Sequence, residues 1–273
     1  MIQFYCRMKS QKGRILWKIS GNPCRRYRQN AGRITAPSLC SVQRIGQNCW
    51  EQRRSVFLCA VIYYRCREVT RHQILRAVFV LMLADEFMKQ TVLLYTGQWN
   101  VTYLPLHLCS INIFVCWYDA IHQSRWSKEI LYALCIPGAV VAMLSPSWQR
   151  LPVWNLLHLH SYSIHVLLIL YPVLLLAGGF RPQVHHIRWV LAFLCAIATP
   201  IFFLNRLLKT NFFFLNDPQG NAITAFFAHC FGERFYLLGF LPVLAAVLLL
   251  LYLPWYRAER HQRMLCARDQ VIA

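Results

Sequence analysis

Long apolar segments separated by short polar linkers fill most of the chain after residue 72. A helix needs about 20 mainly apolar residues to cross a hydrocarbon core of ~30 Å, and most of these segments approach that length. Helices also satisfy their own backbone polar groups, as lipid requires. The pattern predicts an all-α fold, a polytopic transmembrane helix bundle with about six spans. The predicted spans are residues 73–96, 102–121, 130–146, 153–178, 188–205 and 235–254.

The composition, 57% hydrophobic and 14% charged, is typical of a membrane protein. The chain divides into a basic N-terminal segment, 1–55, an integral membrane helical domain, 56–256, and a basic tail, 257–273. The first segment is rich in Cys and Arg without periodicity, so we expect it to be disordered or to reflect a misassigned start. The apolar run at 56–64 is too short to cross a bilayer and is interpreted as the inner half of an altered extra span.

The distribution of basic residues predicts an orientation. Of the 29 Lys and Arg residues, 15 lie in residues 1–72, and the turns 122–129 and 179–188 are also basic, whereas 97–101 has none. By the positive-inside tendency, both termini face the cytoplasm of a multi-pass protein of the cell membrane. The net charge of +19 comes mainly from the N-terminal segment, which has no nucleic-acid-binding motif. Membrane lipids, and no nucleic acid, are the predicted partners.

Several polar side chains interrupt the predicted spans, where they are costly and therefore suggest function. Cys109 follows one turn after Pro105, which suits the first turn of a helix. A cysteine is nucleophilic as a thiolate and needs a nearby base. The histidines of the fourth span, between His158 and His165, offer a candidate base. Glu86 either polarises a partner imidazole or locks two helices together.

The fourth span carries His158, His160 and His165 within eight residues. At helical spacing His158 and His165 share a face, while His160 points elsewhere. Three imidazoles are also compatible with a metal site, but they would bind one ion only with a further ligand, His107 or Glu86, from another helix. The segment has no His-x-x-x-His pattern, so we predict neither a metal nor another cofactor.

Three short motifs, in order, resemble those of a known family. They are Leu104-Pro-Leu-His-Leu-Cys109, a histidine sixteen residues before Arg181-Pro182, and the aromatic segment from Asn211 to Pro218. They are similar to motifs of the YwaF-like integral membrane proteins, related to the transmembrane protein 164 group of acyltransferases. The resemblance covers residues 56–256 and implies transfer of a fatty acyl chain between lipids through a cysteine.

The same resemblance implies roles for individual residues. It suggests Cys109 as the nucleophile, His165 as the base and Asn211 as part of the surrounding pocket. With them we group His107 and Glu86 as predicted substrate-binding residues.

Two alternatives stay open at this point. A small transporter would use Glu86, His107, His158 and His165 as a proton or ion path, because such residues mark pathways as readily as active sites. A membrane protein with a structural role and no chemistry is the other. Replacement of Cys109 separates the first alternative from an acyltransferase, because a transporter would tolerate the change.

Overall fold

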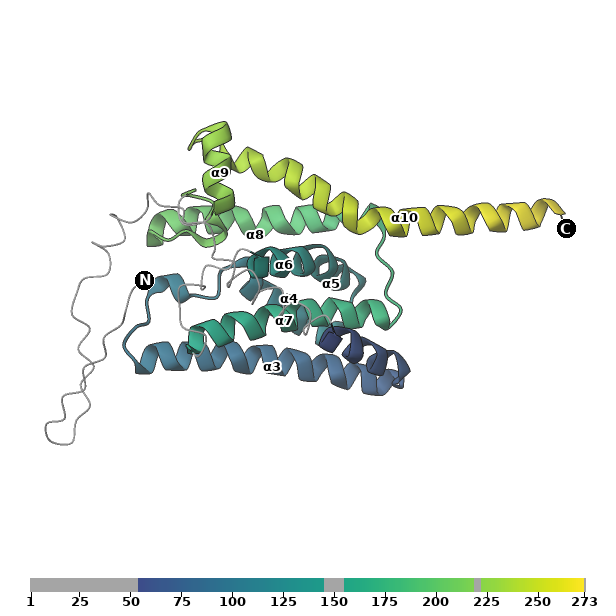
Figure 1. Cartoon of the computed structure of the whole chain (residues 1–273), viewed down its shortest axis with the longest axis horizontal. Coiled ribbons are helices and arrows are strands. Elements are labelled where there is room, and N and C mark those ends of the chain that lie inside the picture. The colour runs from purple at the N-terminus through teal and green to yellow at the C-terminus, as the bar shows by residue number, and fades with distance from the viewer. Residues whose placement is uncertain (1–53, 145–154, 219–221, 273) are drawn as a thin grey trace, which may run out of the picture. The chain divides into compact units, whose positions relative to one another are not determined.

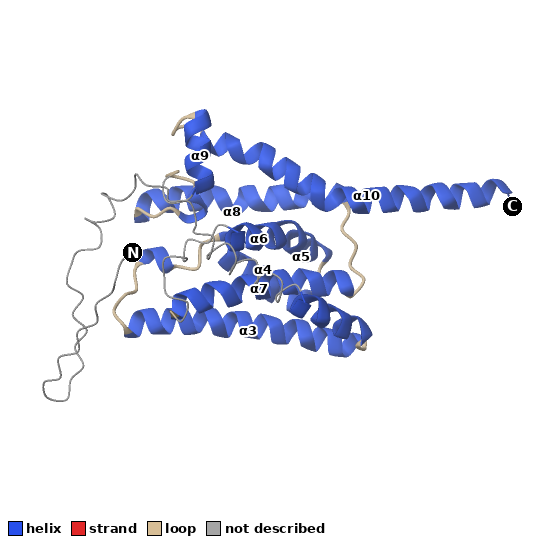
Figure 2. Cartoon of the chain, viewed as in Figure 1, coloured by secondary structure: helices blue, strands red, loops and turns tan. Residues whose placement is uncertain are grey.

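The computed structural model describes residues 54–144, 155–218 and 222–272, all within the unit Trp50–Ala273. Every regular element in these ranges is helical (Figure 2). Of the predicted N-terminal segment 1–55, residues 1–53 lie outside the described part of the chain, and residues 54–65 form a helix. The all-α prediction is therefore confirmed for the described residues.

The long helices follow the hydrophobic pattern, with shorter helical turns between them (Figure 1). The long ones are α3 (Glu68–Tyr95), α4 (Leu108–His122), α7 (Leu156–Ala177), α8 (Ile187–Leu208) and α10 (Phe240–Ile272). The shorter elements are η1 (Val101–Tyr103), α5 (Arg125–Ile130), η2 (Leu131–Cys135), α6 (Ile136–Leu144), η4 (Val184–His186), η5 (Phe212–Phe214), α9 (Ala222–Phe231) and η6 (Tyr236–Gly239).

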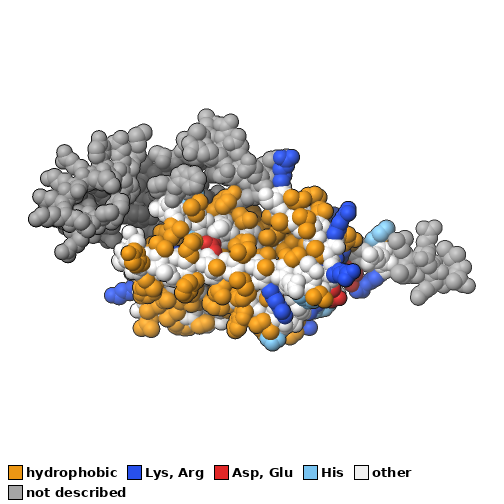
Figure 3. All heavy atoms as spheres, turned by 90° about the horizontal axis from the view of Figure 1, so that it is seen from below, with side chains coloured by type: hydrophobic (Ala, Val, Ile, Leu, Met, Phe, Trp, Pro, Cys, Tyr) orange, Lys and Arg blue, Asp and Glu red, His pale blue; other side chains and the backbone are white. Residues whose placement is uncertain are grey.

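Four of the predicted spans are confirmed as helices long and apolar enough to cross a membrane. They cover Arg125–Leu144, Leu156–Ala177, Val184–Leu208 and Tyr236–Met264. The other two predicted spans coincide with α3 and α4, which are helical but do not meet the same measure of length and hydropathy. The count of six spans therefore stays a prediction. Hydrophobic side chains cover much of the face seen in Figure 3.

A buried core joins α3, α4, η2, α6 and α7. The closest packing is between α3 and α7, which lie side by side in Figure 1. Met82 of α3, Cys116 of α4 and Tyr171 of α7 are fully buried in this core. Only 11% of the apolar stretch of α8 and 22% of that of α10 is buried, so most of the surface of these two helices is exposed. The middle of α10 still reaches the core through Leu248 and Tyr252.

The span Arg125–Leu144 contains one π-helical turn, η2. Pro137 follows this turn and has no backbone N–H to give to the carbonyl of Ala133. A wider turn accommodates the missing bond, as π-helical turns commonly do within α-helices. All five residues of η2 are buried, and Cys135 at its end lies in the core with Cys116.

Two elements were not expected from the sequence. The linker between the last two spans contains α9, ten residues whose apolar composition resembles a short interfacial helix. The predicted basic tail, 257–273, is helical as far as Ile272, because α10 continues past Pro254 without a break (Figure 1).

Candidate active site

Cys109 is the second residue of α4 and lies at the edge of the core, partly buried. His107 precedes the helix as its N-cap residue, in extended conformation, without a side-chain capping bond. The first backbone N–H groups of a helix have no partner within the helix and give this end a partial positive charge. This end of α4 therefore places a partial positive charge close to the Cys109 thiol.

His165 of α7 meets the thiol from the neighbouring helix. Its Nε2 lies 3.2 Å from the Cys109 Sγ. Its Nδ1 contacts the backbone carbonyl oxygen of Ser161, one turn earlier in α7. A carbonyl only accepts hydrogen bonds, so Nδ1 carries the hydrogen and Nε2 of the neutral ring presents a lone pair to the thiol. This tautomer is the one that a general base needs.

The loop after α8 closes against His107. The His107 ring packs edge-to-face on Phe212, with centroids 5.1 Å apart, and lies 6.3 Å from the Phe214 ring. Phe212 is 1% exposed. Phe213 and Phe214 adopt left-handed backbone conformations, with φ of 59° and 54°. Such conformations cost roughly 1–2 kcal/mol for residues other than glycine, so the surrounding bonds must hold the loop in this shape.

Two asparagines, Asn211 and Asn205, supply such bonds. The Oδ1 of Asn211 accepts hydrogen bonds from the backbone N–H groups of Asn216 and Asp217, and its Nδ2 donates to the carbonyl of Asp217. Asn205, 1% exposed, bonds to both the N–H and the carbonyl of Phe212. Asn211 thus stabilises the loop that carries Phe212, which packs against His107. Its contact with a substrate stays a prediction.

Glu86 belongs to a polar cluster between α3 and α7. Its carboxylate lies 2.6 Å from the Lys89 Nζ and accepts a hydrogen bond of 2.9 Å from Gln90. The two ring nitrogens of His160 lie 3.3 Å from the Asp85 carboxylate and 3.6 Å from that of Glu86. The interpretation that Glu86 lies beside an imidazole therefore agrees with the structure, and the imidazole is that of His160.

Ser163 joins this cluster and anchors it on α7. Its Oγ donates to the Asp85 carboxylate at 2.6 Å. The hydroxyl bonds to this carboxylate and to the backbone carbonyl of His160, and not to the His160 ring, so the three residues are not arranged as a serine nucleophile with its base. The cluster instead fixes the turn of α7 that also carries His165. Within the described ranges, no group of three or more His, Cys, Asp or Glu side chains is placed to hold a metal ion.

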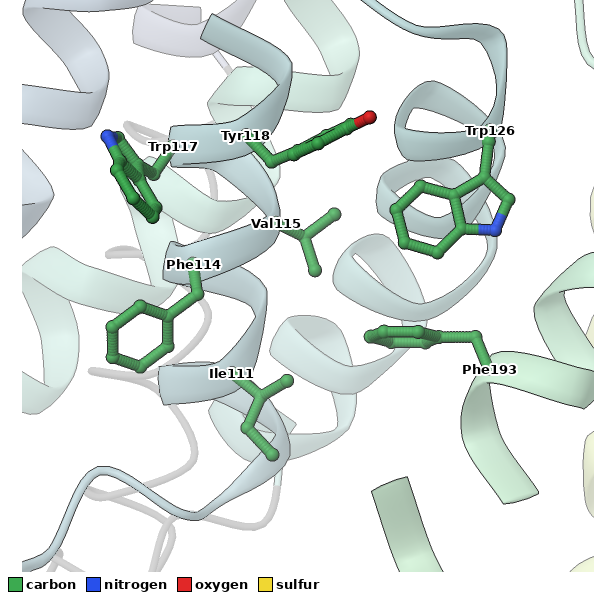
Figure 4. Close-up of a pocket in the computed structure, with 7 residues that line it drawn as sticks. All are labelled: Ile111, Phe114, Val115, Trp117, Tyr118, Trp126 and Phe193. Carbon is green, nitrogen blue, oxygen red and sulfur yellow. The ribbon is translucent and has the colours of Figure 1, made fainter. Parts of the chain in front are cut away.

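An apolar groove of about 530 Å³ lies between α4, α5 and α8 (Figure 4). Its lining residues are Ile111, Phe114, Val115, Trp117, Tyr118, Trp126 and Phe193. Val115 faces Trp126 and Phe193, whose rings pack edge-to-face with centroids 5.7 Å apart. Ile111 follows Cys109 by two residues, or about 200° around the helix. The groove and the thiol therefore lie on opposite faces of α4.

The model of the TMEM164 family matches residues 54–252, which is most of the chain and includes Cys109 and His165. The chain belongs to the TMEM164 family. No curated protein and no solved structure matches it. The predicted resemblance is confirmed at the level of the family, and the protein is a multi-pass membrane protein with several apolar helices.

In this TMEM164 family member, the sequence alone did not reveal the part played by His160. Helical spacing places His160 on a different face from His158 and His165, but it does not identify His160 as the imidazole beside Glu86. Helical spacing gives the face on which a residue lies and not the helix that packs there. A histidine and two adjacent acidic residues in separate spans were the available signal.

Asn211 allows a test of the loop in this family member. In Asn211→Ala three hydrogen bonds are lost, each worth about 0.5–1.5 kcal/mol, so residues 212–217 are expected to open more readily. Hydrogen exchange of the amides in this segment should accelerate by at least tenfold. Asn100→Ala, which removes one capping bond in η1, is the matched control and should leave exchange at 212–217 unchanged. Equal exchange in the two variants would contradict the account of the loop.

Proposed function

We propose that this protein is a lipid acyltransferase that moves a fatty acyl chain between membrane lipids through a thioester on Cys109. The contact of 3.2 Å between the Cys109 Sγ and the His165 Nε2 is the observation that carries the proposal. Membership of the TMEM164 family and the apolar helices around the site are consistent with a lipid substrate. The ion-path alternative has weaker support, because Glu86 is already paired with Lys89.

The first half of the reaction transfers the acyl group to the protein. Nε2 of His165 takes the thiol proton, and the thiolate attacks the carbonyl carbon of a lipid ester, so that the carbon–sulfur bond forms and the carbonyl electrons move to oxygen. The tetrahedral intermediate then collapses and expels the alkoxide of the lysolipid. That alkoxide takes the proton from the His165 imidazolium, which restores the neutral ring.

The second half returns the acyl group to lipid. His165 takes the proton of an acceptor hydroxyl, and the oxygen attacks the thioester. The carbon–sulfur bond breaks, and the thiolate recovers its proton from the imidazolium. The hydrogen bond from Nδ1 to the Ser161 carbonyl keeps the ring in one orientation in both halves. A site at the edge of the core, among apolar side chains, favours transfer over hydrolysis because few water molecules compete with the lipid hydroxyl.

His165→Ala tests the pair directly. Without its proton acceptor, the Cys109 thiol should react with iodoacetamide at least tenfold more slowly at neutral pH, and acyl transfer should fall by about 10²- to 10⁴-fold. Mass spectrometry of the Cys109 peptide separates this thiol from the exposed Cys59, Cys195 and Cys230.

The matched control is His185→Ala, because His185 is an exposed histidine far along the sequence from the site. It should alkylate and transfer at the rate of the unaltered protein. If His165→Ala alkylates as fast as the control and retains transfer, His165 is not the base and the proposed mechanism is wrong.

A further inference from the structure

Asn112 is a buried amide with no hydrogen-bond partner among the residues that the structure describes. Its side chain is 1% exposed, and its Oδ1 is buried without a hydrogen bond. Its Nδ2 donates no hydrogen bond to any residue in the described part of the chain, so the amide can turn about its last bond and present Nδ2 where Oδ1 now lies. Buried polar groups are nearly always paired, because an unpaired one has lost its bonds to water without replacement. An exception of this kind needs an explanation. One explanation is that the amide finds its hydrogen-bond partner only in a reacting substrate.

The position of Asn112 suggests which group that is. It follows Cys109 by three residues in α4, so the two side chains are neighbours on the helix surface, with Cβ atoms about 5–6 Å apart. The same stripe continues to Cys116, which is fully buried. Asn112 therefore lies about one helical turn after Cys109, toward the C-terminal end of α4. It lies on the side of α4 that faces the core and not on the side of the apolar groove.

We propose that the side-chain amide of Asn112 donates a hydrogen bond to the oxyanion that forms when the Cys109 thiolate attacks an acyl ester. The inference rests on the proposed function, since it requires a tetrahedral intermediate at Cys109. When the carbonyl electrons move to oxygen, the new negative charge accepts the hydrogen bond that the resting protein lacks. This hydrogen bond is lost when the intermediate collapses and the carbonyl re-forms, so the amide is neither consumed nor protonated.

This role differs from that of His165. His165 moves the proton of the thiol, so its loss affects every reaction of the thiolate. Asn112 acts only where an oxyanion develops, so its loss affects acyl transfer but not alkylation by iodoacetamide, which displaces iodide at a saturated carbon and forms no oxyanion. The two kinds of reaction therefore separate a donor to the oxyanion from a residue that activates or positions the thiol.

The experiment uses full-length protein in phosphatidylcholine vesicles, with p-nitrophenyl palmitate as the acyl donor. Release of p-nitrophenolate gives the acylation rate, and the mass of the Cys109 peptide locates the acyl group. Asn112→Leu replaces the amide by an apolar side chain of similar size. In this variant acylation should fall by about 10²- to 10³-fold, while alkylation of Cys109 stays within about twofold of the unaltered protein. Cys116→Ala is the matched control from the same stripe and should acylate normally.

Acylation of Asn112→Leu within threefold of normal, or a parallel loss of alkylation, overturns the role of Asn112. If the unaltered protein gains no acyl group on Cys109, the proposed function itself fails and the inference falls with it. Asn112→Ala is the second variant should Asn112→Leu not fold, with its rate divided by the fraction of Cys109 that iodoacetamide can label.

Discussion

Replacing Cys109 by serine is expected to abolish acyl transfer. A hydroxyl is far less acidic than a thiol, and a single neutral imidazole at 3.2 Å does not ionise it as readily. Loss of a nucleophile in comparable catalytic groups reduces turnover on the order of 10⁴- to 10⁶-fold. The measurement is transfer of a labelled acyl chain between two phospholipids in vesicles that contain the purified protein.

Cys195→Ser is the control for that experiment, because Cys195 is an exposed cysteine of α8. It should transfer acyl chains at the normal rate. Under the transporter alternative, Cys109→Ser keeps its transport activity, since an ion path through Glu86 and His165 does not need a thiol. A Cys109→Ser protein that still transfers acyl chains at more than a tenth of the normal rate would rule out the thioester.

Glu129→Ala is expected to have the largest effect on stability. Glu129 is fully buried in α5, and its carboxylate lies 3.5 Å from Arg125 and 3.0 Å from the ring of His186. It accepts hydrogen bonds from the N–H of Gln183 and the hydroxyl of Tyr252. Removing one partner from a buried charged network costs about 3–5 kcal/mol. Thermal unfolding in detergent should shift down by roughly 10 °C.

Two further variants sharpen this test. Glu129→Gln keeps an acceptor for Gln183 and Tyr252 and should lose less stability than Glu129→Ala. Glu259→Ala removes the acid of an exposed pair with Arg263 in α10 and should change the melting temperature very little. If Glu129→Ala and Glu259→Ala unfolded at the same temperature, Glu129 would not hold α5, η4 and α10 together as the structure indicates.

The sequence predicted most of the helices because lipid imposes a simple rule on apolar segments. Their ends were less predictable. The turn η2 depends on Pro137, which was not recognised as a cause of a π-helical turn, and α9 was too short to stand out in the linker. The conformation of Phe213 and Phe214 follows from hydrogen bonds made by Asn205 and Asn211, which only the folded loop brings together.

The candidate site was predictable in part for a chemical reason. A thiol and an imidazole inside apolar helices are uncommon, so Cys109 could be paired by type with a histidine of the fourth span. The choice of His165 among these histidines came from the resemblance to the family. Partners that depend on packing could not be paired in this way. His160 with Asp85, and Glu129 with Tyr252, join helices far apart in the sequence, and nothing in the periodicity of one helix identifies the helix beside it.

The most direct test of a thioester intermediate is whether Cys109 carries an acyl group during the reaction. Full-length protein in vesicles is given a phospholipid with a labelled acyl chain, the reaction is stopped in acid, and the mass of the Cys109 peptide is determined. A thioester on Cys109 makes this peptide heavier by the mass of one acyl group. Neutral hydroxylamine should remove the added mass, and His165→Ala should not accumulate it. Acyl transfer between lipids with no acyl group on Cys109 at any time would contradict the thioester intermediate.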